Sequence, residues 1–346
     1  MTKQKILVTG GTGFIGSHTV VALFDAGYGV TIIDNLSNSF IEVLDGIEKI
    51  SGNKPDFYNI DLTNKEAVNS FFDANSHFDG VIHFAAFKAV GESVEQPLKY
   101  YANNLGSLVN LLENMGRKKI KNLVFSSSCT VYGEPDSLPV TENSPIKKAE
   151  SPYGTTKIMG ETILEDGVKA NIVNAISLRY FNPIGAHPSA LIGEIPIGVP
   201  NNLIPVVTQT AIGKRKKITV YGDDYPTADG SCIRDYIHVT DLAKAHVIAL
   251  KRMTSGSQKK DYEVFNIGTG TGYSVLEVLN TFEKVSGLKL NYEIGNRRRG
   301  DVIQIYADTS FANKELGWMA EENLETMVSS AWAWEQNIPK LFPGLS

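Results

Sequence analysis

Short apolar runs alternate with helix-length amphipathic segments along the first half of the chain, and this alternation constrains the fold more than any other feature. The apolar runs cover residues 6–8, 30–33, 81–84, 123–125 and 172–178, with helical patterns at 14–27 and through Leu108 and Leu111. Repeated strand, helix and strand units predict a parallel sheet that is covered by helices on both faces. The sequence therefore predicts an α/β fold.

The character of the sequence changes near residue 180. The stretch 181–205 is rich in proline, glycine and asparagine, which predicts an ordered loop that opens a second region. That region contains strand-like runs at 218–221 and 262–267 and helical patterns near 203–213, 240–252, 274–285 and 322–337. A chain of 346 residues is long enough for two domains. We expect a sheet domain over 1–180 and a smaller α+β C-terminal lobe mainly over 181–346, from which the chain can cross back to the first domain.

Charge and cysteine content narrow the classes of partner. The chain has 33 Lys and Arg against 38 Asp and Glu, a net charge of −5. Domains that bind duplex nucleic acid usually show a basic excess, so no nucleic acid partner is expected. Two cysteines without a C-x-x-C pair favour a reducing, cytoplasmic location. The six histidines have no metal-ligand spacing and no apolar run approaches the ~20 residues of a membrane span, so we expect neither a metal nor a membrane partner.

A glycine motif directly follows the first predicted strand. Gly10, Gly13 and Gly16 form a G-x-x-G-x-x-G spacing that opens the predicted helix. Such glycines let the backbone approach a pyrophosphate at the helix N-terminus; a plain glycine turn is the alternative. Asp34, at the end of the second strand, is placed to bind ribose hydroxyls and would repel a 2′-phosphate. The pattern predicts a Rossmann-type doubly wound sheet that binds NAD rather than NADP. Asp61 follows a further strand and is either an adenine contact or a helix N-cap.

A second constellation lies near residue 150. Tyr153 and Lys157 are four residues apart after Ser151 and Pro152, which predict a helix start, so both side chains share one helix face. An ammonium nearby would lower the pKa of the tyrosine from about 10 towards neutrality. Tyrosine and lysine at this spacing also occur by chance on solvated helices. Upstream, Ser128 follows the fifth strand and is placed to bind a substrate hydroxyl or, alternatively, to bond within its own turn.

Cys129 follows Ser128, and we interpret it as a packing residue.

Several strings in the sequence resemble the UDP-glucose 4-epimerases, a family of extended short-chain dehydrogenases/reductases. They are the glycine motif, His-Phe-Ala-Ala-Phe-Lys-Ala-Val-Gly-Glu-Ser at 83–93, the segment around Ser128, the Tyr153 and Lys157 pair, Leu-Arg-Tyr-Phe-Asn-Pro at 178–183 and Arg-Asp-Tyr-Ile-His-Val at 234–239. The similarity runs from about residue 5 to Trp332-Ala333-Trp334. The glycine and tyrosine–lysine motifs indicate only the superfamily, whereas the longer strings are more specific.

The resemblance implies a set of site residues. Ser128, Tyr153 and Lys157 would be catalytic. Contacts to tightly bound NAD would come from the three motif glycines and from Phe14, Ile15, Asp34, Asn35, Asn38, Asp61, Leu62, Phe84, Lys88, Asn103, Tyr153, Lys157 and Phe181. The UDP-sugar would be bound by Ser128, Asn182, Asn202, Leu203, Tyr221, Arg234, Arg298, Asp301 and Ile305. Two guanidiniums from separate segments can clamp a diphosphate through bidentate bonds, although Arg297, Arg298 and Arg299 are also compatible with solvated surface.

The resemblance further implies the reaction, an isomerisation of galactose metabolism. UDP-glucose and UDP-galactose would interconvert at C4 through a transient 4-keto sugar, with hydride passed to NAD and returned. Related dehydratases carry Thr-Asp-Glu where Ser128-Cys129-Thr130 stands here, so the acid for elimination is missing. A non-catalytic NAD-sensing protein on this fold would be expected to lose Tyr153, Lys157 or Asn182, and all three are present.

Substrate breadth and assembly are further expectations from the resemblance. Position 305 gates room for the sugar 2-substituent, where bulky tyrosine tends to exclude N-acetylhexosamines. Isoleucine is shorter but β-branched and stiff, which favours glucose and galactose as the main pair and leaves the N-acetylated pair open. The family is typically homodimeric, and the helix around Leu105, Leu108, Val109 and Leu112 is a candidate contact. An ordinary buried crossover helix is the alternative.

Overall fold

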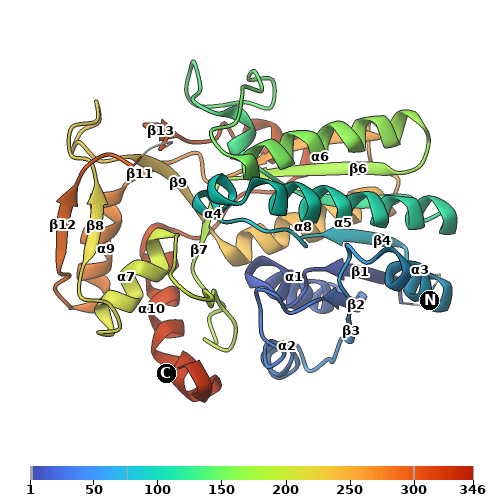
Figure 1. The fold of residues 1–346 in the computed structure, drawn as a ribbon, viewed down its shortest axis with the longest axis horizontal. Coiled ribbons are helices and arrows are strands. Elements are labelled where there is room, and N and C mark those ends of the chain that lie inside the picture. Colours follow the sequence, from blue (N-terminus) through green and yellow to red (C-terminus); the bar gives the residue numbers. More distant parts are fainter. Residues whose placement is uncertain (1–2, 76, 299–300, 346) are drawn as a thin grey trace.

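The computed structural model describes residues 3–75, 77–298 and 301–345, and a seven-stranded parallel sheet forms its centre (Figure 1). The strands follow the order β10-β6-β5-β4-β1-β2-β3. Their bounds are β1 (Lys5–Thr9), β2 (Gly29–Asp34), β3 (Asp56–Asn59), β4 (Gly80–His83), β5 (Asn122–Ser128), β6 (Asn174–Tyr180) and β10 (Tyr262–Ile267). The order 3-2-1-4-5-6 is that of a Rossmann-type doubly wound sheet, so the predicted fold class is confirmed.

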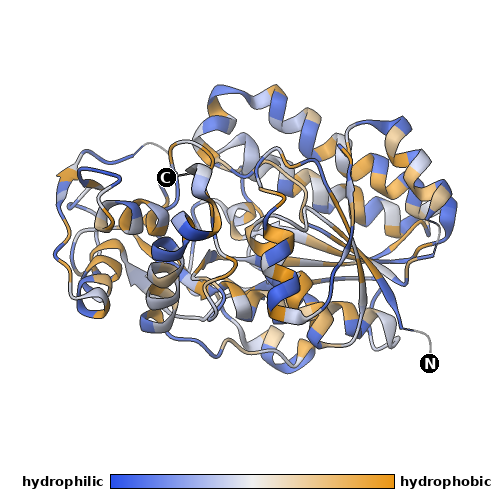
Figure 2. Ribbon diagram, turned by 90° about the horizontal axis from the view of Figure 1, so that it is seen from below, coloured by the Kyte–Doolittle hydropathy of each residue, from blue (hydrophilic) through white to orange (hydrophobic). Residues whose placement is uncertain are grey.

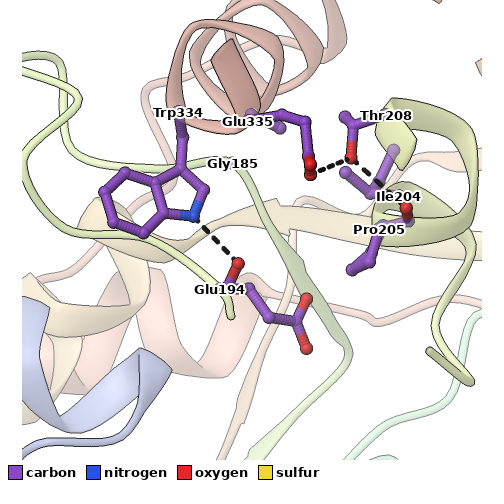
Figure 3. A pocket seen from close by; sticks show the side chains of 8 residues that line it. Gly185, Glu194, Ile204, Pro205, Thr208, Trp334 and Glu335 are labelled. Carbon is purple, nitrogen blue, oxygen red and sulfur yellow. Dashed lines mark hydrogen bonds between the residues drawn. The ribbon is translucent and has the colours of Figure 1, made fainter. Parts of the chain in front are cut away.

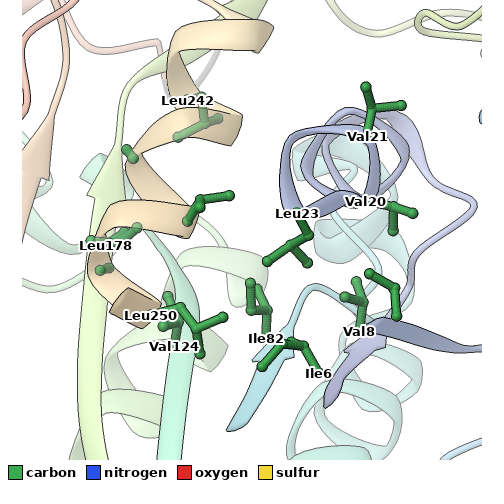
Figure 4. Close-up of a cluster of buried hydrophobic side chains, with 14 of the residues drawn as sticks. Ile6, Val8, Val20, Val21, Leu23, Ile82, Val124, Leu178, Leu242 and Leu250 are labelled. Carbon is green, nitrogen blue, oxygen red and sulfur yellow. The ribbon is translucent and has the colours of Figure 1, made fainter. Parts of the chain in front are cut away.

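Helices cover both faces of this sheet. One face carries α1 (Phe14–Asp25), α2 (Val43–Ser51) and α8 (Val239–Thr254), and the other carries α3 (Lys65–Ala74), α5 (Pro97–Lys118) and α6 (Pro152–Lys169). The short α4 (Val90–Glu95) precedes α5. Side chains alternate between the two cores: Ile6 and Val8 pack with α1 and α8, whereas Leu7 packs on the opposite face (Figure 4). Burial on both faces explains why the strands read as continuous apolar runs.

A smaller lobe stands beside the carboxyl edge of the sheet. It contains the strands β7 (Asn182–Ile184), β9 (Ile233–His238), β11 (Gly272–Ser274) and β13 (Gln304–Ile305) in one sheet, and β8 (Ile218–Tyr221) with β12 (Tyr292–Gly295) in another. Its helices are α7 (Leu203–Ala211), α9 (Val275–Ser286) and α10 (Leu324–Leu341). Figure 2 shows strongly hydrophobic central strands and helices that carry both hydrophobic and hydrophilic residues. The lobe has a core of its own.

Two predicted elements differ from the structure. The strand expected in the second region at 262–267 returns to the central sheet, where it pairs in parallel with β6. The strand expected from residue 172 begins at Asn174, because the Ile172 N–H still bonds to the Gly167 carbonyl in the turn that ends α6.

The helix that was the candidate dimer contact is α5, and its apolar residues are divided. Leu108 and Leu112 are buried in the core under the sheet, as the crossover-helix alternative predicts, while Val109 is 40% exposed. Among the residues that the structure describes, no helix combines the length and the apolarity needed to span a membrane, and no group of three or more His, Cys, Asp or Glu side chains could hold a metal ion.

Four buried histidines make the fold sensitive to acid. Burial lowers the pKa of His18 and His83 to about 3 and of His238 and His246 to about 4. Below pH ~6.5 the unfolded chain therefore takes up protons that the folded chain does not, and the free energy of unfolding falls as the pH falls towards 4. Each histidine contributes on the order of 1 kcal/mol per pH unit in this window.

We expect the urea midpoint of unfolding to drop steeply between pH 6.5 and 5. His246→Gln removes one titrating group and should make the decline shallower by about a fifth, since burial lowers the pKa of His187 as well and five histidines share the decline. His77→Gln, at an exposed position, is the matched control and should leave the pH dependence unchanged. An equal slope in the parent and in His246→Gln would contradict the assignment.

Candidate functional site

The site residues gather at the carboxyl edge of the central sheet. Gly10 follows β1, Asp34 ends β2, Phe84 follows β4 and Ser128 ends β5. The lobe reaches the same edge through Asn182 at the start of β7. Ligands of open parallel sheets bind at this edge.

The glycine turn after β1 leaves no room for side chains. Gly10 has a φ of +72°, and a Cβ there would lie 2.8 Å from the Ala85 nitrogen. A Cβ on Gly16 would lie 2.1 Å from the Gly10 carbonyl oxygen. Gly13 is the N-cap of α1 and has no side chain to bind the first amides of the helix. Backbone N–H groups at this helix start can therefore bind an anion such as a pyrophosphate.

Two acidic side chains lie beside this turn. The Asp34 carboxylate accepts hydrogen bonds from the backbone nitrogens of Thr12 at 3.2 Å and Leu36 at 2.9 Å, which fix it next to the glycines. Asp61 accepts from the Thr63 nitrogen and hydroxyl and from Asn35. Burial alone would raise the pKa of Asp61, but these hydrogen bonds lower it below its usual value. The N-cap alternative for Asp61 is wrong for α3, because the Asn64 side chain caps that helix.

The remaining predicted cofactor residues lie on elements that follow the strands or on the helices beside them. Phe14 and Ile15 begin α1, Asn38 lies exposed in the turn after β2, and Leu62 is buried after β3. The centroid of the Phe84 ring lies 4.6 Å from the centroid of the His246 ring. Asn103, on α5, donates a hydrogen bond to Asn104 at 2.9 Å.

Sequence reasoning missed Asn104, which ties three segments together. Its side chain bonds to both the nitrogen and the oxygen of Phe87 and donates to the Thr156 hydroxyl at 3.0 Å. It thereby holds the loop after β4 against α6, the helix that carries Tyr153. A polar residue within an amphipathic helical pattern carries no signal that distinguishes this role from surface solvation.

The expected catalytic residues lie together. Ser151 caps α6 and Pro152 begins it, which places Tyr153 and Lys157 on one face, as predicted. The Lys157 Nζ is 5.7 Å from the centroid of the Tyr153 ring and donates to the Ser126 carbonyl at 2.7 Å. Ser128 lies close enough to the Tyr153 phenol to lower its pKa, and its Oγ accepts a hydrogen bond from the Thr130 nitrogen at 3.2 Å. The turn role of Ser128 and its place beside Tyr153 therefore coexist.

The pKa of Tyr153 differs from the expectation based on helix spacing. Burial raises it to about 12, and Ser128 offsets only part of that rise. Burial also lowers the pKa of Lys157 to about 8, which weakens the ammonium as a source of positive charge. The prediction that Lys157 lowers the pKa of Tyr153 towards neutrality is wrong for the protein alone, since Lys157 is buried and Tyr153 is partly buried. A further positive charge is needed to stabilise the phenolate.

A buried ion pair supports this region and was not predicted. The Glu161 carboxylate accepts from Arg179 Nε at 2.9 Å and Nη2 at 2.6 Å and from the Ser127 hydroxyl at 2.5 Å. Arg179 also donates to the Tyr132 hydroxyl at 3.1 Å. Glu161 lies one helical turn after Lys157, and its hydrogen bond fixes the side chain of Ser127, the neighbour of Ser128. The available signal was Arg179 itself, because an arginine within a buried strand requires a partner.

The two arginines proposed for a diphosphate meet at one carboxylate. Arg298 makes bidentate hydrogen bonds to Asp301 at 2.7 and 3.1 Å, and Arg234 Nη2 lies 3.8 Å from the same side chain. The Arg298 guanidinium lies 5.5 Å from the centroid of the Tyr221 ring. Arg297 instead pairs with Asp224, and Arg299 lies outside the described residues. Both side chains are exposed, so Arg298 differs from Arg297 in its partner, Asp301, and not in its burial.

An apolar cluster borders the catalytic residues. Cys129, Phe181 and Ile305 are all buried in it, with exposed fractions of 8%, 3% and 4%. Burial raises the pKa of Cys129 to about 12, which confirms its interpretation as a packing residue rather than a nucleophile. Ile305 lies on β13, which pairs with β9 at Arg234.

Asn202 and Leu203 lie at the start of α7, in the lobe. The Asn202 amide donates to Glu194 at 2.8 Å.

Comparisons with known proteins agree with this geometry. The sequence pattern described as the NAD dependent epimerase/dehydratase family matches residues 6–268. The UDP-glucose 4-epimerase of Bacillus subtilis is 51% identical over 335 residues, 96% of this chain and 97% of that protein. The UDP-glucose 4-epimerase of Yersinia enterocolitica is 49% identical over 337 residues, 97% of this chain and 98% of that protein.

A solved structure extends the similarity to three dimensions. The UDP-glucose 4-epimerase from Bifidobacterium longum in complex with NAD+ and UDP superposes with a TM-score of 0.93 at 46% identity, covering 98% of this chain and all of the other. The sequence matches and the superposition both extend over nearly the whole chain. The chain therefore belongs to the NAD dependent epimerase/dehydratase family and, within it, to the UDP-glucose 4-epimerases.

Proposed function

We propose that this protein interconverts UDP-glucose and UDP-galactose at the sugar C4 atom, using bound NAD. The observation that carries this function is the meeting of Ser128, Tyr153 and Lys157 with the glycine turn at one edge of the sheet. Relatives that share about half of the sequence over the whole chain are UDP-glucose 4-epimerases.

The residues at the glycine turn suit NAD. A Cβ would fill the space at Gly10 and Gly16, so the backbone can approach a pyrophosphate there. Asp34, held by two backbone amides, would accept the ribose hydroxyls and repel a 2′-phosphate. When bound, NAD+ would supply the acceptor and later the donor of a hydride, together with a positive charge that favours the phenolate. Phe84, Asn103 and the others named above would complete the contacts.

Tyr153 acts as the general base and acid. As a phenolate it takes the proton of the C4 hydroxyl while the C4–H bond breaks, which leaves a 4-keto sugar. Ser128 donates a hydrogen bond to the C4 oxygen of the sugar. Lys157 holds positive charge beside the phenolate. After the sugar turns within the site, Tyr153 returns the proton to the carbonyl oxygen as C4 is reduced on its other face.

The nucleotide anchors the intermediate while the sugar turns. Arg234 and Arg298 are already close to each other at Asp301, and a diphosphate would form bidentate bonds to both. Asn182, Asn202, Leu203 and Tyr221 would bind the rest of the UDP-sugar. Retention matters because a released ketone would end the cycle and leave the cofactor reduced.

Proton NMR of the protein with UDP-galactose and no added NAD tests this function. We expect the anomeric signal of UDP-glucose to grow to an equilibrium mixture, which requires retained cofactor. If the signal grows only after NAD is added, the reaction stands but tight retention does not. If no UDP-glucose forms even then, the proposed activity is wrong.

The wall formed by Ile305 sets the room for the sugar 2-substituent. We expect Ile305→Tyr to lower any activity on UDP-N-acetylglucosamine by tenfold or more and to change activity on UDP-galactose by less than about threefold, because the larger ring fills the apolar cluster. The ratio of kcat/KM for the two substrates measures this. Ile294→Tyr, on the exposed face of β12, is the control. An unchanged ratio would remove Ile305 from the pocket wall.

We also propose a homodimer, a cytoplasmic location and a division into domains at residue 180. Val94 and Leu98, on α4 and α5, are 60% and 79% exposed, and a second copy would cover these apolar side chains. Both cysteines are unbridged, which suits a reducing compartment. Light scattering at micromolar concentration tests the dimer.

A further inference from the structure

Glu194 lies between the two ligand sites and holds a side chain from each. Its Oε1 accepts a hydrogen bond from the Lys88 Nζ at 2.8 Å and another from the Asn202 Nδ2 at 2.8 Å. Lys88 belongs to the sheet domain and is a proposed NAD contact, whereas Asn202 starts α7 of the lobe and is a proposed UDP-sugar contact. The Glu194 side chain is 13% exposed and that of Lys88 is 44% exposed, and Asn202 is exposed as well, so a largely buried carboxylate holds two donors that remain accessible from solvent.

The fold fixes the backbone of Glu194, though not its side chain, independently of either ligand. The Trp334 Nε1, on α10, donates to the Glu194 carbonyl at 2.9 Å (Figure 3). A Cβ on the preceding residue, Gly193, would lie 2.5 Å from the Trp334 ring, so the chain lies directly against that ring. The carboxylate therefore extends from a backbone anchored by the C-terminal helix.

Lys88 can serve Glu194 and a cofactor at the same time. Its Nζ lies 5.9 Å from the centroid of the Phe14 ring, at the first residue of α1. An ammonium has three donors, so a bond to Glu194 leaves donors for an anionic oxygen near that helix start. Charge-assisted bonds of this type are stronger than neutral ones.

The Asn202 side chain does not cap the helix that it precedes. It occupies the N-cap position of α7, where an asparagine side chain usually accepts a hydrogen bond from the helix, but it makes no such capping bond. Its amide instead donates to Glu194. The carboxylate thereby sets the orientation of this amide at the start of α7.

We propose that Glu194 is a positioning residue that couples NAD binding to binding of the uridine nucleotide. Ordering Asn202 by the nucleotide orders Glu194 and, through it, Lys88, so the second ligand binds with less loss of conformational freedom. Coupling of this kind is reciprocal for the two affinities. The inference rests on the proposed function, because it takes Lys88 and Asn202 as contacts of the two ligands.

The test compares NAD affinity with and without saturating UDP, by equilibrium dialysis of the whole protein. In the parent protein, we expect UDP to lower the Kd for NAD by about five- to tenfold. In Glu194→Gln, the effect should fall below about twofold, since the amide keeps the size and can still accept from Asn202 but lacks the charge that holds Lys88. Glu194→Asp keeps the charge and should recover part of the effect.

Glu113→Gln is the matched control. Glu113 makes an exposed ion pair with Lys65 at 2.6 Å, and this variant should show the full effect of UDP. The KM for UDP-galactose should rise severalfold in Glu194→Gln, with kcat at saturation of both ligands within about threefold, as expected for a residue that does not touch the reacting atoms.

Three results would overturn the inference. The first is a full UDP effect in Glu194→Gln, and the second is an equal loss of NAD affinity with and without UDP, which would indicate a local role. The third is a parent that epimerises UDP-galactose but whose NAD affinity does not respond to UDP. A parent that binds neither ligand would instead overturn the proposed function, and the coupling with it.

Discussion

Replacing Tyr153 by phenylalanine is expected to lower kcat for UDP-galactose by about 10²- to 10⁴-fold while NAD remains bound. The phenol is the group placed to move the C4 hydroxyl proton, and a positioned general acid or base contributes a factor of this size. Phenylalanine keeps the ring, so the packing of this side chain at the start of α6 is preserved. Initial rates from proton NMR, with NAD content measured on the same sample, separate loss of chemistry from loss of cofactor.

Tyr292→Phe is the control for this substitution. Tyr292 lies on β12 and is 44% exposed, away from the catalytic residues. Its rate should equal that of the parent. If Tyr153→Phe retained more than about a tenth of the parent kcat, proton transfer would have to pass through another group, and Ser128 would be the next residue to replace.

Replacing Arg179 by methionine is expected to cost about 3–5 kcal/mol of the free energy of unfolding. The guanidinium and the Glu161 carboxylate are 5% and 4% exposed, so the substitution leaves a buried carboxylate without its counter-charge. Of the partners described above, the Glu161 carboxylate would then keep only the Ser127 hydroxyl. Urea unfolding of the parent and the variant at pH 7.5 measures the difference.

Two further proteins make this result interpretable. Arg117→Met breaks an ion pair with Asp73 whose side chains are 42% and 56% exposed, and it should cost no more than about 1 kcal/mol. The double variant Arg179→Met with Glu161→Leu should recover most of the lost stability, since both charges are gone. If Arg179→Met lowered the free energy of unfolding no more than Arg117→Met does, the Glu161 carboxylate would have to be neutralised by a proton or hydrated by water in the variant.

The sheet was predictable because its strands are buried on both faces. Runs such as Ile6-Leu7-Val8 are unbroken in the sequence, and Gly10 with Asp34 mark the strand ends at which the chain must turn towards a ligand. The return of residues 262–267 to the sheet was not predicted. An apolar run reports that a strand is buried but not which strand it pairs with.

The site was predictable where local spacing decides the geometry. Tyr153 and Lys157 share a face because they are four residues apart on a helix that Ser151 begins. The partners of Lys88 and Lys157 were not predictable in this way. Glu194 is 106 residues from Lys88, and only the folded chain brings them together. The direction of the Tyr153 pKa shift was also predicted wrongly from the sequence, because burial of the phenol depends on residues distant in the chain.

Strand β10 has a consequence for how this protein is made. When the ribosome has released residues up to Tyr180, β6 stands at the border of an incomplete sheet, with one row of backbone groups exposed. The strand that covers it begins at Tyr262, about 80 residues later, which is roughly 4–16 s of synthesis. During that interval a neighbouring nascent chain can pair with β6 instead. A fragment truncated before Tyr262 keeps this open edge permanently, so a nucleotide-binding half expressed alone should aggregate, whereas the whole chain protects itself once translation passes β10.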